Sequence, residues 1–444
     1  MKRSNKAVAG LLACMMALTT ACSSTGAPSG GKSNQAPSQA GTGAGEKQKM
    51  VFWDKSEYVK SYNTLMKKKV DEFSKEKNVD VDYVIIPSND VKQKIMAAIE
   101  AKNVPDLVVG DDSQCAQYVT MDQIADVSDV LAGLNLTDAA KEFSKINGKP
   151  VFVPQAFVAP GMYIRMDKWK EKGLSAPKTW DELKEQAKIV NDPKNGFYAL
   201  GFPMGASGGG DAEGFMRSVI LSFGGVPVDP AGKVTINSTA TLNALNYVAS
   251  LYQEGLCPPD AMTWDDSANN SAYLAGTVGV VFNSGSIWSS IKSEKKQLLD
   301  KTQIISYPQG PSGKSYAPGG TNVFAVFKTG KNEKTAKDFI KYFYADKDNY
   351  NTMVEAMGGM WQPVLNGMDG TTFWKQTENS GWLANSKSLV RNFYPAPADN
   401  YANLTISNQL CVKAVQNIVV KKTDPQAALD QLEQSFKQIY KDRK

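Results

Sequence analysis

Between residues 50 and 110 the sequence alternates between strand and helix patterns, and this alternation restricts the fold more than any other feature. Short apolar runs predict strands, and apolar side chains at near-helical spacing predict the helices between them. The predicted strands are residues 50–53, 79–85 and 107–109, and the predicted helices are residues 58–73 and 91–99. Strands that alternate with helices form a parallel sheet with helices on both faces. We therefore expect an α/β fold.

Parallel sheets of this kind bind ligands beyond the carboxyl ends of their strands. Trp53, Asp54 and Lys55 end the first predicted strand, and Asp111 with Asp112 follows the third. The sequence therefore predicts a binding site at this edge of the sheet.

A second α/β region follows. Its predicted strands are residues 162–164, 197–202, 278–282 and 323–327, and its helices include residues 180–190, 215–223, 333–344 and 425–439. Thr179 and Glu182 form a capping box at the start of one of these helices. At ~100 to 200 residues per domain, the length of 444 residues predicts two or three domains.

The sequence contains no histidine. This absence excludes Ser/His/Asp and Cys/His nucleophile pairs and HExxH zinc helices, and it removes the side chain that most often transfers protons near neutral pH. Because no other side chain ordinarily titrates between about pH 5 and 8, we expect ligand affinity to be nearly flat over that range.

The formal net charge is +5, from 50 Lys and Arg against 45 Asp and Glu. Binding to nucleic acid needs clustered positive charge, so this balance predicts no nucleic-acid partner. The basic run at residues 67–69 is interpreted as a solvated helix face.

The N-terminal segment has the pattern of a secretory signal peptide, with basic residues before an apolar run and small residues leading to Cys22. A cysteine after small residues resembles the lipidation motif of bacterial lipoproteins, although Thr19 stands where that family usually has Leu. The stretch ending at Cys14 fits the motif better but leaves only about seven apolar residues. We expect a signal peptide at residues 1–21, a lipidated Cys22 that anchors the chain to the outer face of a bacterial plasma membrane, and a flexible linker to residue 48.

Neither the remaining cysteines nor the glycine-rich segments predict a cofactor or a metal. Cys115, Cys257 and Cys411 have no CxxC spacing, so we expect small buried hydrophobic residues, with one disulfide and a spare thiol as the alternative. Residues 208–210 and 310–315 lack the spacing of dinucleotide and phosphate loops.

From residue 49 onwards the order of elements resembles the sugar-binding group of ABC-importer solute-binding proteins, the maltose-binding-protein-like family. The most specific match is residues 161–183, which are similar to a family stretch ending in Pro-Lys-Thr-Trp-Asp-Glu-Leu. Residues 274–288, Gly319-Gly320 and residues 360–363 also match. At residues 165–167 the usual turn residues are replaced, so family contacts are not carried over there.

The resemblance implies a type II periplasmic-binding-protein-like fold, in which two α/β lobes close on a ligand around a hinge. It implies an N-terminal lobe at residues 49–159 with 319–363 and a C-terminal lobe at residues 160–318 with 364–444. The implied protein is a monomeric, membrane-anchored extracellular receptor that binds a carbohydrate, expected to be an oligosaccharide, and delivers it to ABC-importer permease subunits without catalysis.

A carbohydrate cleft needs aromatic rings against sugar faces and charged or amide partners for hydroxyls. The predicted ligand contacts are Trp53, Asp54, Asp111, Asp112, Trp264, Trp288, Gly319, Gly320, Asn322 and Trp361. Each has a structural alternative: the tryptophans pack in a core, an aspartate caps a helix, and the glycines form a hinge turn.

Three other functions stay open, of which one is an adhesion or structural lipoprotein. The same fold could bind a non-sugar solute such as a polyol phosphate, a polyamine or a peptide, although a phosphate would need clustered arginines. A secreted glycoside-active enzyme would need two carboxyls held ~5 to 9.5 Å apart, which sequence neighbours such as Asp111 and Asp112 do not ensure.

Overall fold

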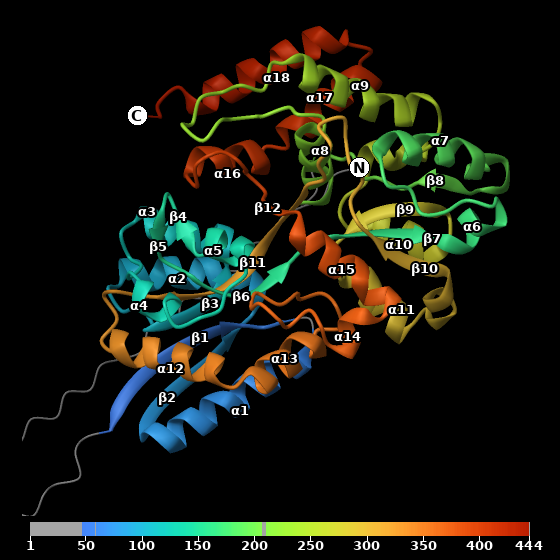
Figure 1. The fold of residues 1–444 in the computed structure, drawn as a ribbon. Coiled ribbons are helices and arrows are strands. Elements are labelled where there is room, and N and C mark those ends of the chain that lie inside the picture. The colour runs from blue at the N-terminus through green and yellow to red at the C-terminus, as the bar shows by residue number, and fades with distance from the viewer. Residues whose placement is uncertain (1–46, 58, 207–209, 444) are drawn as a thin grey trace, which may run out of the picture. The chain divides into compact units, whose positions relative to one another are not determined.

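The computed structural model describes residues 47–57, 59–206 and 210–443, which all belong to the unit Lys47–Lys444 (Figure 1). The predicted signal peptide, Cys22 and nearly all of the predicted linker lie outside the described residues. Within the described ranges, every helix is too short or too polar to span a membrane.

The first sheet contains the strands that the alternating pattern predicts. Strands β1 (Gln48–Lys55), β2 (Val79–Ile86) and β3 (Leu107–Asp111) pair in parallel, with β1 in the middle. Strand β11 (Ala317–Val326) lies antiparallel to β3, β6 (Val153–Val158) lies antiparallel to β11, and β12 (Leu389–Arg391) is parallel to the start of β11. The sheet is therefore mixed, and the expectation of a parallel sheet is correct only for its first three strands. The other strands come from distant parts of the chain, which local patterns cannot place.

Helices cover both faces of this sheet, as predicted (Figure 1). Helices α1 (Lys60–Lys77) and α12 (Glu333–Ala345) pack on one face, where the Phe339 ring centroid lies 5.3 Å from those of both Phe52 and Phe73. Helices α2 (Val91–Glu100) and α3 (Asp112–Thr120) pack on the other face. Burial of such aromatic and aliphatic side chains contributes about 1.5–3 kcal/mol each. Lys69 departs from the predicted solvated face, because it is buried and pairs with Glu72 and Asp346.

The second sheet has the order β10 (Thr302–Ile305), β7 (Gly161–Arg165), β9 (Val278–Asn283) and β8 (Tyr198–Leu200). The helices of this part are α6 (Met166–Glu171), α7 (Trp180–Val190), α8 (Asp211–Ser222), α9 (Thr239–Gln253), α10 (Ala268–Ala275), α11 (Ser286–Ser293), α17 (Leu410–Val419) and α18 (Pro425–Tyr440). Thr179 Oγ1 accepts the Glu182 N–H at 3.1 Å, as the capping box predicts. The Glu182 carboxylate, however, accepts from the Lys178 N–H, one residue before the expected donor.

Shorter elements complete the described part. They are α4 (Ser128–Leu131), α5 (Asp138–Phe143), β4 (Lys145–Ile146), β5 (Lys149–Pro150), α13 (Lys347–Ala356), α14 (Thr372–Lys375), α15 (Thr377–Lys387) and α16 (Asn400–Ser407), with 3-10 turns at Ser88–Asp90, Pro193–Asn195, Pro259–Thr263 and Lys296–Lys301. Cys115, Cys257 and Cys411 are free and buried, which confirms the expectation of small hydrophobic residues.

Segments that join the two sheets lie side by side. Strand β6 of the first sheet continues through Ala159 and Pro160 into β7 of the second sheet. Strand β11 starts beside this crossing, where a Cβ on Gly319 would lie 2.9 Å from Pro160 Cδ. Gln362 exchanges backbone hydrogen bonds with Phe157, and its Oε1 accepts the Ala159 N–H at 3.0 Å. Glycine at position 319 is required by this close approach.

A buried ion pair ties α8 to α17 beside the second sheet. Glu213 and Arg217 are 0% and 3% exposed, and Arg217 Nε donates to Glu213 Oε1 at 3.1 Å. Glu213 Oε2 also accepts the backbone N–H groups of Cys411 and Val412 at the start of α17. One carboxylate thus neutralises a buried cation and caps a helix.

We expect Glu213→Ala to lower the free energy of unfolding by about 3–5 kcal/mol, because it leaves the Arg217 charge buried without a partner. Urea denaturation of the whole protein measures this change. Lys67→Ala removes the exposed pair of Lys67 with Asp71 and serves as the control, with an expected change below about 1 kcal/mol. Equal effects of the two substitutions would contradict the assigned role of Glu213.

Candidate ligand cleft

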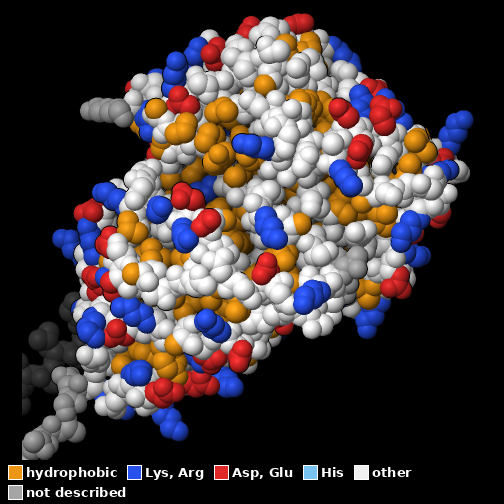
Figure 2. Space-filling model, viewed as in Figure 1, with side chains coloured by type: hydrophobic (Ala, Val, Ile, Leu, Met, Phe, Trp, Pro, Cys, Tyr) orange, Lys and Arg blue, Asp and Glu red, His pale blue; other side chains and the backbone are white. Residues whose placement is uncertain are grey.

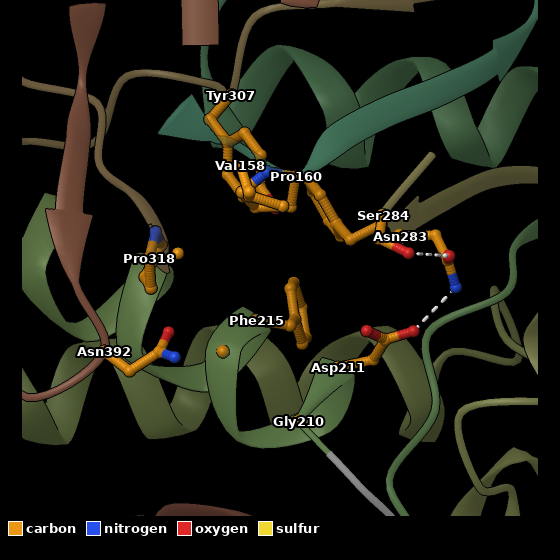
Figure 3. Close-up of a pocket in the computed structure, with 13 residues that line it drawn as sticks. Val158, Pro160, Gly210, Asp211, Phe215, Asn283, Ser284, Tyr307, Pro318 and Asn392 are labelled. Atoms are coloured by element: carbon orange, nitrogen blue, oxygen red, sulfur yellow. Dashed lines mark hydrogen bonds between the residues drawn. The ribbon is translucent and has the colours of Figure 1, made fainter. Parts of the chain in front are cut away.

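Two adjoining cavities, each of about 180 Å³, lie between the sheets. The first is lined mainly from the second-sheet side, by residues that include Asp211, Phe215 and Asn283 (Figure 3). The second is lined from the first-sheet side, by residues that include Asp111, Asp112 and Arg391. Val158, Gly319 and Asn392 line both cavities, so together they form one space, called the cleft below.

Asp111 presents a partly exposed carboxylate to the cleft. Lys55 Nζ donates to Asp111 Oδ1 at 2.6 Å and lies 3.2 Å from Glu57 Oε1. Burial lowers the pKa of Lys55, but attraction to these two carboxylates outweighs it, so that pKa lies above its usual value. Asp111 precedes α3 but its side chain makes no capping bond, and 42% of it is exposed. It can therefore accept a hydrogen bond from a ligand.

Asp112 forms the floor of the cleft with Arg391. Its Oδ2 accepts from Arg391 Nε at 2.8 Å, and its Oδ1 accepts the Thr321 N–H at 3.1 Å. Burial raises the pKa of Asp112, and the Arg391 charge opposes this rise. A Cβ on Gly320 would lie 2.8 Å from Asp112 Oδ1, so glycine permits this approach. The pair joins α3 to β12 across the end of the first sheet.

Asp211 faces the cleft from the opposite side, at the first residue of α8. Its Oδ2 accepts from Asn283 Nδ2 at 2.7 Å and from Asn269 Nδ2 at 3.1 Å, and Figure 3 shows the Asn283 contact at the cavity wall. Burial raises the pKa of Asp211 to about 7, and the nearby Asp266 carboxylate adds to this rise. Within the described ranges no Lys or Arg pairs with Asp211. Its carboxyl can therefore take a ligand hydroxyl as its partner.

Aromatic rings close the second-sheet side of the cleft. The Phe215 and Phe282 rings stack at 5.2 Å between centroids and 23° between planes, and Phe282 lies 4.7 Å from Tyr307. Figure 3 shows Phe215 standing in the cavity opposite Val158 and Pro160. The rings of Phe215, Phe282 and Tyr307 are 1%, 2% and 4% exposed, so they belong to the second-lobe core and border the cleft as an apolar wall beside its carboxyl and amide groups.

Of the ten predicted contact residues, Asp111, Asp112, Gly319 and Gly320 line the cleft. Trp53, Asp54, Trp264, Trp288, Asn322 and Trp361 do not line its two cavities. Whether any of the ten contacts a ligand stays a prediction.

The tryptophans mostly pack against protein. Trp288 and Trp361 are 3% and 2% exposed and belong to the same hydrophobic core, and Trp361 lies 4.6 Å from the Tyr62 ring. Trp264 is half-buried, with its Nε1 donating to Asp260 at 3.0 Å, and Trp53 packs on the α2 side of the first sheet. This burial favours the packing alternative for Trp288 and Trp361.

Asp54 and Asn322 lie buried near the Lys55 cluster. Asp54 accepts from the Tyr83 hydroxyl at 2.6 Å and from the Tyr62 hydroxyl at 3.1 Å. Burial raises the pKa of Asp54 to about 7, although both tyrosines oppose the rise. Asn322 Oδ1 is buried and has no hydrogen-bond partner within the described ranges.

Sequence reasoning missed Asp211, Phe215, Asn283, Arg391 and Asn392. Asn283 directly follows the strand predicted at residues 278–282, so the strand-end rule applied to the second region would have found it. Asp211 follows a glycine-rich stretch at the start of a predicted helix. Arg391 and Asn392 carry no local signal, because only the fold brings them to the cleft.

Two α/β lobes, each built on one sheet, are joined by adjacent crossing segments and enclose a polar cleft. This is the two-lobe architecture of periplasmic binding proteins, as predicted. The chain belongs to the family described as bacterial extracellular solute-binding protein, whose family model matches residues 56–350.

Individual relatives agree with this membership. A probable ABC transporter-binding protein of Deinococcus radiodurans is 28% identical over 307 residues, covering 66% of this chain and 70% of the relative. The polygalacturonan/rhamnogalacturonan-binding protein YtcQ of Bacillus subtilis is 24% identical over 370 residues, covering 77% and 74%. The solved structure of the sugar-binding protein MalE from Xanthomonas citri shares the fold, with a TM-score of 0.76, 14% identity and coverage of 89% of this chain and 98% of that one.

The raised pKa values of Asp54 and Asp211 predict that stability falls as pH rises from about 4 to 7. In this window the folded protein holds protons that the unfolded chain has released, so the free energy of unfolding decreases until the carboxyls ionise near pH 7. Urea denaturation at several pH values measures the slope. Asp54→Asn should make this slope shallower, and an unchanged slope would contradict the assignment to Asp54.

Proposed function

We propose that this protein is an extracellular receptor that binds an uncharged oligosaccharide in the cleft and delivers it to an ABC importer. The observation that carries the proposal is that carboxyl and amide groups able to bind hydroxyls line one cleft from opposite lobes, beside an apolar wall. Asp111 approaches from the first lobe, and Asp211, Asn283 and the Phe215 ring approach from the second. The names of two relatives, a polygalacturonan/rhamnogalacturonan-binding protein and a sugar-binding protein, support a carbohydrate ligand, whereas its neutral charge is argued from the cleft alone.

The charges in the cleft favour a neutral ligand over a phosphorylated one. An anion would need free guanidinium or ammonium groups, but Arg391 is paired with Asp112 and Lys55 with Asp111 and Glu57. Away from the cleft, Arg165 pairs with Asp167 and Arg217 with Glu213. An incoming phosphate would meet the carboxyl of Asp211 and would have to break existing ion pairs.

The charges on one face of the protein also give no indication of an anionic partner. On the face shown in Figure 2, basic and acidic side chains are interspersed, without a broad area of either sign. Nucleic acid would require a continuous basic area, so we propose none as a partner.

Closure of the two lobes around the ligand would give the importer its signal. We propose a first lobe at residues 49–159 with 319–363 and a second at residues 160–318 with 364–444, with the hinge where Pro160, Gly319 and Gln362 meet. A ligand that contacts both lobes favours the closed state by its differential affinity. No bond of the ligand needs to break in this cycle, so we propose a receptor without catalysis. We also propose that it acts as a monomer.

Asp211 supplies one argument for a second candidate, a glycoside-active enzyme. A carboxyl whose pKa lies near 7 suits a general acid. Incubation of the protein with the oligosaccharides named below, followed by an assay for new reducing ends, separates the two functions. A receptor releases none, whereas turnover that is lost in Asp211→Asn would replace the receptor proposal.

Titration calorimetry with neutral oligosaccharides of two to six units tests the receptor proposal. The malto-, cello- and laminari- series are the carbohydrate probes, and glycerol phosphate, spermidine and a tripeptide are the alternatives. We expect at least one saccharide series to bind and the alternatives not to bind. Binding of spermidine, tripeptide or glycerol phosphate without any saccharide would refute the carbohydrate assignment.

The same titrations locate the binding site. Asp211→Ala should weaken saccharide binding about tenfold, as expected for the loss of a hydrogen bond to a charged group. Asp80→Ala, at an exposed position on β2, is the matched control and should leave affinity unchanged. Thermal unfolding of both variants verifies that the fold is retained.

We also propose that Cys22 is lipidated and holds the receptor at the outer face of the plasma membrane after removal of residues 1–21. Cys22→Ser should move the protein from the membrane fraction to the medium in cell fractionation, because the lipid supplies the anchor. Cys14→Ser is the control and should remain with the membrane. The reverse result would place the lipid on Cys14.

A further inference from the structure

A third cavity, of about 600 Å³, continues from the cleft and is lined by residues of α3 and α16. Figure 1 shows these two helices near each other. The third cavity shares Ser113, Asn392 and Phe393 with the cleft cavity on the first-lobe side, and Asn392 lines all three spaces. The cleft is therefore the inner part of a longer groove that opens between the two helices.

The walls of this outer part carry side-chain amides. We call it the amide groove and define it by Gln114, Gln117, Asn392, Asn400 and Asn403. Within the described ranges, none of these five side chains makes a hydrogen bond to protein. Each amide can donate and accept, and so can each hydroxyl of a sugar. The groove therefore holds convergent, unpaired groups of the kind that a polyhydroxyl chain can satisfy.

Three apolar side chains, those of Phe393, Leu404 and Ile406, also line the amide groove. Lys92 is the one charged residue among those that line it. The Phe393 ring is buried at its base, while Leu404 on α16 is 46% exposed. An apolar floor between amide walls matches a sugar ring, whose faces are apolar and whose rim carries hydroxyls.

Each wall is attached to its own lobe by hydrogen bonds, an ion pair or buried side chains. Asp399 caps α16 by accepting the Ala402 N–H at 2.8 Å, and it also pairs with Arg443. Arg217 of α8 donates to Thr405 on α16 at 3.0 Å. On the opposite wall, the inner side of α3 carries Cys115 and Tyr118, and both side chains are buried in the first-lobe core. These contacts hold the two helices in place on either side of the groove.

We propose that the amide groove binds the additional units of an uncharged oligosaccharide whose first two units occupy the cleft. This inference rests on the proposed function and deepens it, since it assigns the cargo a length greater than two units. The outer cavity is about three times larger than either inner cavity, so most of a bound chain would lie in the amide groove.

Calorimetry with a disaccharide and a tetrasaccharide of the same series tests this inference. The probe pairs are maltose with maltotetraose, cellobiose with cellotetraose, and laminaribiose with laminaritetraose. In the double variant Asn400→Ala with Asn403→Ala, the tetrasaccharide should lose about tenfold in affinity through two lost hydrogen bonds. The disaccharide should change less than about twofold, because it fits within the cleft.

The matched control is the double variant Asn243→Ala with Asn246→Ala, which removes two exposed asparagines at the same spacing from α9. It should change neither affinity. Gln114→Ala with Gln117→Ala repeats the test from the opposite wall and should reproduce the tetrasaccharide loss.

Three outcomes overturn the inference. Equal losses for the two sugars would make the amide groove the primary site, and unchanged tetrasaccharide affinity in both groove variants would show that the groove is not used. If no saccharide binds the unsubstituted protein, the proposed function itself fails and the inference fails with it.

Discussion

Strand β11 is the element on which the ligand cleft depends. It pairs with β3 and β6 in the first sheet, and its first residues pair with β12. It therefore holds β3 and β6 of the first lobe beside β12, which comes from a distant part of the chain. Gly319 and Gly320 allow this arrangement, because a Cβ at either position would collide with Pro160 or with Asp112. The same strand presents the Thr321 N–H to Asp112, and Asp112 in turn holds Arg391. Backbone packing at one point therefore positions the charged floor of the cleft.

The carboxyl groups around the cleft divide into two kinds. Asp111, Asp112 and Glu57 have cationic partners, which compensate their charges. Asp211 has amide partners only, and Asp54 has tyrosine hydroxyls, so burial raises the pKa of both towards neutrality. A chain without histidine thus acquires groups that titrate near pH 7. This outcome revises the expectation of nearly flat ligand affinity between about pH 5 and 8, since ionisation of Asp211 would change a hydrogen-bonding group in the cleft wall.

The fold was more predictable from the sequence than the site. Strands β1 to β3 and helices α1 and α2 follow from apolar periodicity, which reports local structure. The strand-end rule pointed to Asp111 and Asp112, which line the cleft, because parallel strands end at the same edge. It could not find Arg391, which lies 279 residues from its partner Asp112. The tryptophan contacts could not be judged from sequence, because a turn or strand end does not reveal whether a ring faces a cavity or a core. The structure buries Trp288 and Trp361.

By itself the sequence determined the α/β class and the absence of histidine chemistry, and it predicted a signal peptide and a lipidated Cys22, because each follows from residue types within a short stretch. Only the tertiary structure decided which polar groups meet. The uncompensated carboxyl of Asp211, the paired state of Arg391 and the convergence of amides from α3 and α16 arise from contacts between distant segments. Long-range packing sets the burial and partners of a side chain, and these two quantities determine whether it is free to bind a ligand.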